Sequence, residues 1–185
     1  AYDLITSGRE PVLGIVLSYP DPPPARRPRQ ELKARRGTAQ GFGISLVGAG
    51  NFARLVMMPA LSRLKGFDLR GLCSAKGMNA VFSGEKLGFS FATTELAELL
   101  NDDRTGAVLI ATRHDLHAEM VVAALRAGKH VFVEKPLCIR PEELNAITAC
   151  VDELGPGCPM LMVGFNRRFA RATQQLREHF HGVTP

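Results

Sequence analysis

The stretch Ile44-Ser45-Leu46-Val47-Gly48-Ala49-Gly50-Asn51-Phe52-Ala53 decides the fold. Residues 44–47 form an apolar run that predicts a buried strand, and the residues after it match the pattern G-x-G-x-x-G/A. Gly48 allows a tight turn, Gly50 lets the backbone approach a diphosphate, and the small Ala53 lets the following helix pack on the strand. Unpaired N–H groups at the start of that helix favour an anion. We predict a dinucleotide site that includes Gly48, Gly50, Asn51 and Phe52.

Two other interpretations of this turn stay open. A glycine-rich connection between a strand and a helix can form without binding any ligand. A similar fold can also hold a methyl donor. The glycine pattern alone does not choose among the three.

From residue 42 to about 180, short apolar runs alternate with longer amphipathic stretches, which is typical of β-α units and a parallel sheet. The expected strands are 44–47, 67–73, 89–92, 107–111, 129–133 and 160–163. The expected helices are 52–64, which Pro59 could kink, then 79–87, one capped by Thr94, 115–127 capped by Asp115, one that starts at Pro141, and 170–179. The helix from Pro141 is expected to bury Leu144, Ile147, Val151 and Leu154. This order predicts an α/β fold, a doubly wound, mostly parallel sheet (Rossmann fold), over residues 42–181.

The composition describes an ordinary globular protein. The chain has 185 residues, 45% of them hydrophobic and 22% charged, and no run approaches the ~18 apolar residues of a membrane span. Its first residues lack the pattern of a signal peptide. The cysteines, Cys73, Cys138, Cys150 and Cys158, show no metal-ligand spacing. We therefore expect free thiols in the cytoplasm, no metal and no membrane partner.

The net charge of +5 is concentrated in one segment. Residues 21–36 carry six basic and two acidic side chains, or +4, among several prolines. We interpret residues 20–41 as an extended linker. A basic arm for nucleic acid is the alternative, but the segment has no aromatic side chain to stack on bases, so we expect no nucleic-acid partner. Before it, residues 11–17 are apolar and β-branched and predict a strand, the tail of a preceding module over residues 1–19.

The second strand indicates which cofactor is bound. A dinucleotide site often has Asp or Glu at the end of this strand to bind the ribose 2′-hydroxyl. Here the strand ends in Cys73-Ser74-Ala75-Lys76, without an acidic residue. Ser74 could bind a ribose hydroxyl or a phosphate, and Lys76 a 2′-phosphate, which favours NADP over NAD. The alternative is that Lys76 is a solvated loop charge.

Another apolar strand delivers Glu134-Lys135-Pro136 at its carboxyl end, the edge where open α/β sheets bind ligands. Lys135 could donate a proton or a hydrogen bond to a substrate oxygen. Pro136 would fix the turn that aims it, and a cis bond before Pro136 is one way to do so. A structural ion pair between Glu134 and Lys135 is the alternative.

Four runs in order carry a family resemblance: Gly48-Ala49-Gly50-Asn51, then Ala111-Thr112 with His117 downstream, then Ala127-Gly128-Lys129-His130-Val131 leading to Glu134-Lys135-Pro136-Leu137, and Val163-Gly164-Phe165-Asn166-Arg167-Arg168-Phe169. The series resembles the nucleotide-binding half of the glucose–fructose oxidoreductase / inositol dehydrogenase family (Gfo/Idh/MocA), over about residues 43–180. The run from Gly128 to Pro136 is its specific part.

The resemblance implies hydride transfer between NAD(P) and a hydroxyl or keto group of a sugar, cyclitol or related small molecule. Lys135 matches the family lysine near nicotinamide and substrate, which makes it the expected catalytic residue. The expected cofactor-binding residues are Ser74, Lys76, Thr112, Arg113, His117, Glu134, Pro136 and Arg168, besides those of the glycine turn. A histidine packed on the sheet is the alternative for His117, and the spacing does not choose between Arg167 and Arg168.

The family's second half, which supplies much of the substrate pocket and usually a catalytic histidine, would begin where this chain ends. We therefore expect a catalytically incomplete module that self-associates through the surface left uncovered. Residues 1–17 resemble the tail of a zinc-type medium-chain alcohol dehydrogenase, as in a bi-domain oxidoreductase. A non-catalytic NAD(P)-binding regulatory module is the first alternative. A ligand-free interaction module is the second.

Overall fold

The computed structural model describes residues 2–8, 11, 14–18, 28–33 and 41–182. The strands are β1 (Arg29–Glu31), β2 (Phe42–Val47), β3 (Phe67–Cys73), β4 (Phe91–Thr93), β5 (Ala107–Ile110), β6 (His130–Glu134) and β7 (Leu161–Gly164). The α-helices are α1 (Tyr2–Ser7), α2 (Met58–Leu61), α3 (Gly77–Leu87), α4 (Leu96–Leu100), α5 (His117–Arg126), α6 (Pro141–Leu154) and α7 (Arg171–His179). A π-helical turn (Ala53–Met57) and 3₁₀ turns (His114–Leu116, Gly155–Gly157, Asn166–Phe169) complete the elements.

The strands form one sheet in the order β1-β4-β3-β2-β5-β6-β7. All neighbouring pairs are parallel except β1 with β4. The chain winds outward from β2 first toward β3 and later toward β5, so the carboxyl end of β2 is the point where the strand order reverses. Doubly wound sheets bind ligands in the crevice at this point, and the predicted fold is confirmed.

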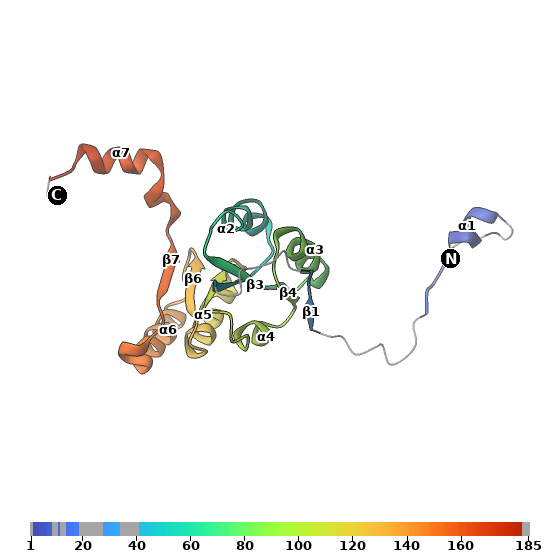
Figure 1. Ribbon diagram of the computed structural model, residues 1–185, viewed down its shortest axis with the longest axis horizontal. Helices are drawn as coiled ribbons and strands as arrows, with labels where there is room; N and C mark the ends of the chain where they lie inside the picture. The colour runs from blue at the N-terminus through green and yellow to red at the C-terminus, as the bar shows by residue number, and fades with distance from the viewer. Residues whose placement is uncertain (1, 9–10, 12–13, 19–27, 34–40, 183–185) are drawn as a thin grey trace.

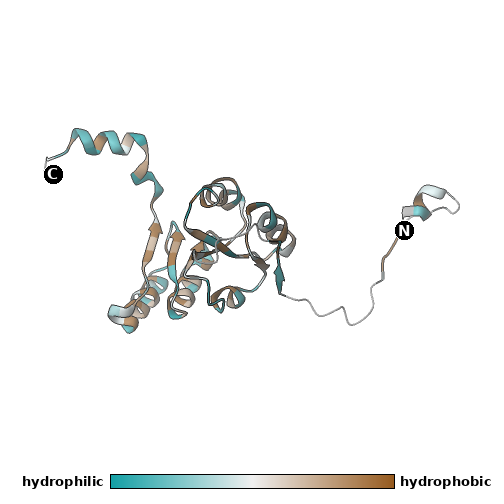
Figure 2. Cartoon of the chain, in the orientation of Figure 1, coloured by the Kyte–Doolittle hydropathy of each residue, from teal (hydrophilic) through white to brown (hydrophobic). Residues whose placement is uncertain are grey.

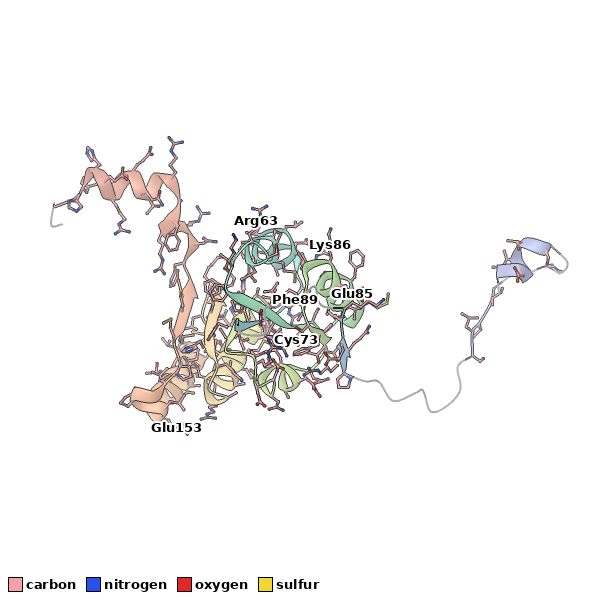
Figure 3. All side chains as sticks on the ribbon, in the orientation of Figure 1. Arg63, Cys73, Glu85, Lys86, Phe89 and Glu153 are labelled. Atoms are coloured by element: carbon pink, nitrogen blue, oxygen red, sulfur yellow. The ribbon has the colours of Figure 1, made fainter. Side chains whose placement is uncertain are left out.

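Each sheet face has its own core, because alternate side chains of a strand point to opposite faces. Val47 and Cys73 pack with α5 and α6 in one cluster, while their neighbours Leu46 and Leu72 pack in the other with the helix after β2. Figure 1 shows α4, α5 and α6 below the sheet and α2 and α3 above it. Figure 3 shows labelled Phe89 and Cys73 inside the domain, whereas Glu153 of α6 lies at its periphery and pairs with Arg126.

A buried polar network fixes the opposite edge of the sheet. The Arg70 guanidinium donates two hydrogen bonds to the Asp102 carboxylate, at 3.1 and 2.9 Å, and one to Ser90 Oγ at 3.0 Å. Thr105 Oγ1 donates to the same carboxylate at 2.8 Å. This network ties β3 to the loop before β5, away from the carboxyl ends of the strands.

Part of the predicted linker belongs to the sheet, which corrects the 20–41 boundary. Residues 28–33 are described, and β1 pairs antiparallel with β4. The run from Arg29 to Lys33 contains no proline, so its N–H groups are free to pair. Leu32 is buried, and the Arg29 guanidinium lies 3.7 Å from the centre of the Phe91 ring. The remaining linker residues lie outside the described ranges.

The strand predicted over residues 11–17 is wrong where the structure describes it. Residues 14–18 have no regular secondary structure and are exposed, while Val12 and Leu13 lie outside the described residues. An apolar run becomes a stable strand only beside a hydrogen-bonded neighbour. Tyr2–Ser7 forms a short helix that the sequence did not predict.

Several helix boundaries also differ from prediction. The helix after β2 widens into a π turn at Ala53–Met57, where the missing N–H of Pro59 removes an α-helical hydrogen bond to the preceding turn, and the helix ends at Leu61. The N-terminal cap position of α4 is held by Glu95, where Thr94 was predicted. α5 is preceded by a 3₁₀ turn that includes Asp115, where Asp115 was predicted to cap the helix.

On α6, Leu144, which was predicted to be buried, is 47% exposed, whereas Ile147 is buried as expected. α6 packs on α5, and this contact covers a stripe with Ile147 buried and Val151 and Leu154 partly buried, while Leu144 lies outside it.

One sheet face is partly uncovered. A groove of about 710 Å³ lies over β2, β5, β6 and β7 beside α2, and its lining, which includes Phe42, Phe67, Phe132 and Met162, is almost wholly apolar. Figure 2 shows the hydrophobic colour of β6 and β7, and Figure 1 shows α7 leaving this end of the sheet and pointing away from the domain. No residue of α7 is buried. We call this surface the apolar groove.

Candidate functional site

The glycine turn after β2 has the geometry its sequence predicts. Gly48 has φ +103°, and a β-carbon there would lie 2.4 Å from the Ala111 carbonyl oxygen. The Gly48 N–H donates to the Cys73 carbonyl at 2.8 Å, so this turn is held between the ends of β3 and β5. At Gly50, by contrast, a β-carbon would meet no atom within 4 Å. The backbone at Gly50 thus faces open space, the condition for close approach of a diphosphate.

The residues around the turn add polar groups to this space. Asn51 and Phe52 are exposed at the start of the helix, and Ala53 is buried against the sheet, as its predicted packing role requires. The Arg54 guanidinium donates to Asn51 Oδ1 at 3.2 Å. A cation therefore lies beside the glycine turn, where it would complement an anionic ligand.

The predicted ribose residues lie at the end of β3. The Ser74 N–H donates to the Thr93 carbonyl at 3.0 Å, and its side chain is half-buried. Lys76 is exposed directly before α3. Their neighbour Cys73 is buried, and burial, with a smaller contribution from the charge of Glu95, raises the pKa of its thiol to about 11. This thiol stays protonated and unreactive at neutral pH.

A cleft of about 240 Å³ opens at the carboxyl ends of β5 and β6, next to the glycine turn. Its lining residues are Phe52, Ala111, Thr112, His114, His117, Glu134, Lys135 and Asn166. We call it the strand-end cleft. It brings together five residues predicted from sequence: Phe52, Thr112, His117, Glu134 and Lys135. They come from three chain segments that lie side by side only in the folded sheet.

Lys135 is the exposed cation of the strand-end cleft. Within the described residues its ammonium group makes no ion pair or hydrogen bond, and Glu134 pairs with no cation there either. The structural ion pair considered from sequence is therefore absent between these two residues. The peptide bond from Lys135 to Pro136 is cis. An ammonium group left without a protein partner remains available to a substrate oxygen.

His117 is fully buried at the base of the cleft. Its Nδ1 lies 2.7 Å from the Pro136 carbonyl oxygen, and its Nε2 lies 3.3 Å from the Thr112 carbonyl oxygen. The ring thus bridges the two loops that carry Thr112 and Lys135. The His114 ring packs edge-on against it, with centroids 5.7 Å apart.

The two predicted arginines do not line the cleft. Arg113 is exposed and pairs with Asp115 at 2.7 Å, and this bond is the main reason that the pKa of the Asp115 carboxyl is low. Arg168 is also exposed; its Nε donates to the Phe165 carbonyl at 3.1 Å, and its guanidinium lies 5.7 and 5.8 Å from the Phe165 and Phe169 rings.

Besides the apolar Ala111, two polar lining residues were not assigned from sequence, His114 and Asn166. Both follow a parallel strand directly or after a short turn, and that position at the carboxyl edge is the feature that could have identified them. Asn166 even lies inside the run that carried the family resemblance.

In the described part of the chain, no three His, Cys, Asp or Glu side chains gather as a metal site. All four cysteines are free. No helix among the described residues is long and apolar enough to cross a bilayer.

The model of the oxidoreductase family with an NAD-binding Rossmann fold, Gfo/Idh/MocA, matches residues 42–180. A 4-carboxy-2-hydroxymuconate-6-semialdehyde dehydrogenase of a Sphingobium species is 34% identical over 72% of this chain and 41% of its own length. Myo-inositol 2-dehydrogenase of Thermotoga maritima is 37% identical over 51% of this chain and 27% of its own length.

Among solved structures, a 3-ketoreductase from Actinomadura kijaniata in complex with NADP has a TM-score of 0.63 and 27% identity. This similarity covers 75% of the present chain and 44% of that one. The chain thus spans less than half the length of these relatives. The family model begins at residue 42, so the resemblance of residues 1–17 to an alcohol dehydrogenase stays a prediction. The strand order, the glycine turn at the reversal of the sheet and the match over residues 42–180 agree, and the chain belongs to the Gfo/Idh/MocA family of oxidoreductases.

Proposed function

We propose that this chain is the cofactor-binding module of an NAD(P)-dependent oxidoreductase that acts on a hydroxyl or keto group of a sugar, cyclitol or related small molecule. One observation carries the proposal: the open glycine turn at Gly50 and the unpartnered cation of Lys135 meet at the same edge of the sheet, around the strand-end cleft. The names of the myo-inositol and 3-keto relatives support the substrate class.

The residues present fit a dinucleotide. The space beside Gly50 admits a diphosphate, with Asn51 and Arg54 next to it. Phe52 and Thr112 line the path from that turn to Lys135. When bound, a nicotinamide ring supplies or accepts the hydride.

Lys135 handles the proton in this proposal. During reduction its ammonium group donates a proton to the substrate oxygen as a hydride reaches the carbon, and during oxidation the neutral amine takes the hydroxyl proton back. Thr112 and Glu134 offer a hydroxyl and a carboxylate in the same cleft as Lys135 to orient a polyhydroxy substrate or the cofactor.

We propose NADP as the preferred cofactor, because Lys76 is exposed and no carboxylate follows β3. A 2′-phosphate would gain a charge-assisted bond at Lys76. The NADP complex of the 3-ketoreductase relative supports the same preference.

The cleft is too small to enclose a cofactor and a substrate, since ligand pockets usually measure about 300–1,000 Å³, against about 240 Å³ here. We propose that further residues, outside this domain, complete the substrate pocket.

The apolar groove and the exposed Leu176 and Phe180 near the chain's last described residues are candidate surfaces for self-association. Light scattering tests this, and a strict monomer would contradict it. With its free thiols and bound NADP, the protein would suit a reducing, cytoplasmic setting; neither nucleic acid nor a membrane is proposed as a partner.

Turnover tests the function. Purified protein that carries this domain together with its substrate-binding part is incubated with NADP and a panel of inositols and glycosides, and NADPH is followed by absorbance. We expect turnover that the Lys135→Met variant loses while its NADPH affinity is unchanged. Binding of NADPH without turnover on any polyol would favour the alternative, a non-catalytic NAD(P)-binding regulatory module.

A further inference from the structure

The contacts of His117 differ from those expected of a cofactor ligand. The side chain is fully buried, and each ring nitrogen faces a backbone carbonyl oxygen rather than the open part of the cleft. Carbonyl oxygens only accept hydrogen bonds, so each contact requires an N–H on the ring. A neutral imidazole carries only one such proton. The contact from Nδ1 to the Pro136 carbonyl oxygen is the shorter one, at 2.7 Å. A single ring proton therefore makes its stronger hydrogen bond on Nδ1.

The two carbonyls belong to neighbouring parts of the site. Thr112 follows β5, Pro136 follows β6, and these strands are adjacent and parallel. The Pro136 carbonyl is one residue beyond Lys135, so a bond to it fixes the turn from which the lysine side chain projects. His117 itself begins α5, whose buried face packs against α6 and the sheet.

We propose that His117 is a positioning residue: by donating its Nδ1–H to the Pro136 carbonyl, it holds the Glu134–Pro136 turn against the loop after β5 and sets where the Lys135 ammonium lies. The significance of this bond for catalysis rests on the proposed function, whereas the bond and its effect on Lys135 do not.

Two isosteric substitutions separate the two contacts. The amide nitrogen of Asn occupies about the position of the histidine Nδ1, so His117→Asn retains a donor for Pro136. The amide nitrogen of Gln occupies about the position of Nε2, so His117→Gln retains a donor for Thr112 alone. His117→Leu fills space but donates to neither carbonyl. If His117 only filled space, the effect of each substitution on Lys135 would follow the volume of the new side chain. The proposed bond instead predicts that His117→Asn preserves the position of Lys135 better than His117→Gln or His117→Leu.

The readout is the environment of Lys135 in the cofactor-free chain. The sequence has six lysines, which are converted to ¹³C-dimethyl-lysine and observed by NMR, and the Lys135→Arg variant assigns the relevant resonance. We expect the Lys135 resonance to keep its wild-type position in His117→Asn and to move in His117→Gln and His117→Leu, while the other lysine resonances stay fixed. Equal shifts in the Asn and Gln variants, or an unchanged resonance in the Leu variant, would overturn the proposal.

A second measurement needs no substitution, in case a variant does not fold. ¹⁵N NMR of the histidine rings in the wild-type chain reports which nitrogen carries the proton. We expect a proton on Nδ1 of His117 above neutral pH, and a ring protonated on Nε2 alone would refute the proposed bond. NADPH binding is then measured separately. If NADPH fails to bind while Lys135 responds as expected, the proposed function fails and the positioning role stands.

Discussion

The two glycines of the turn after β2 should respond in opposite ways to a single added methyl group. Gly48→Ala places a β-carbon 2.4 Å from the Ala111 carbonyl oxygen at a φ of +103°, whereas Gly50→Ala places one in open space. The first change therefore tests the fold. The second tests the ligand site at the same turn, in the same chain, with the same added atom.

The magnitude for Gly48→Ala has two sources. A left-handed backbone costs a residue with a β-carbon about 1–2 kcal/mol. The loops after β2 and β5 must also move apart, and overpacking of this kind costs about 1–3 kcal/mol. The sum, about 2–5 kcal/mol, corresponds to a fall in Tm of roughly 4–20 °C for a chain of this size.

Gly50→Ala should leave Tm within about 2 °C of the wild type, since replacing glycine in an allowed conformation costs the folded state little. Its NADPH affinity should fall at least about tenfold, equivalent to ~1.4 kcal/mol, because the methyl group occupies the space for the diphosphate. Thermal unfolding and fluorescence titration measure the two effects. A Gly48→Ala variant as stable as the wild type would refute the reasoning about the turn, and a Gly50→Ala variant with full NADPH affinity would refute the placement of the diphosphate.

Three further outcomes are expected. In the buried pair of Asp102 with Arg70, burial acts to raise the pKa of Asp102, but the hydrogen bonds from Arg70 and Thr105 outweigh it and hold the pKa below its usual value. The stabilising effect of the Asp102–Arg70 pair should persist at neutral pH and disappear as the pH falls below about 4. Asp102→Asn should cost about 3 kcal/mol in urea unfolding at pH 7 and progressively less as the pH is lowered from about 4 through the lowered pKa, and a loss that stays constant over this acidic range would contradict this. Lys76→Glu should weaken NADPH binding by about tenfold or more and leave NADH affinity nearly unchanged, as expected for a lost charge-assisted bond worth ~1.5 kcal/mol or more; parallel losses for both nucleotides would contradict the 2′-phosphate assignment. The Cys73 thiol, with its pKa raised to about 11, should react with a thiol reagent far more slowly than the half-buried Cys158 at pH 7.5, and equal rates would contradict its burial.

The local sequence was sufficient to predict the glycine turn and the parallel sheet. Gly48 and Gly50 belong to a short pattern whose geometry is fixed within a few residues, and β3 was predicted with its observed bounds, Phe67–Cys73. Such features depend on periodicity and on backbone conformations that only glycine adopts easily, and both can be read from neighbouring residues.

The features that were missed depend on contacts between distant segments. β1 became a strand because Arg29 and Leu32 reach Phe91 and the α3 region, which are about 50 to 60 residues away along the chain. The same limit applies to the site: the sequence placed His117 near the cofactor, but its bond to the Pro136 carbonyl appears only when β5 and β6 are side by side.

Thermal unfolding of this chain with NADPH and with NADH tests the central claim most directly. A ligand that binds only the folded state stabilises it by about 2.7 kcal/mol at a concentration of 100 times Kd, or roughly 5–10 °C in Tm for a chain of this size. We predict that NADPH raises Tm by this amount, that NADH raises it less at the same concentration, and that Gly50→Ala reduces the NADPH shift by about half or more, as a tenfold or greater loss of affinity requires. An unchanged Tm with both nucleotides at millimolar concentration would contradict the assignment of this turn as a dinucleotide site.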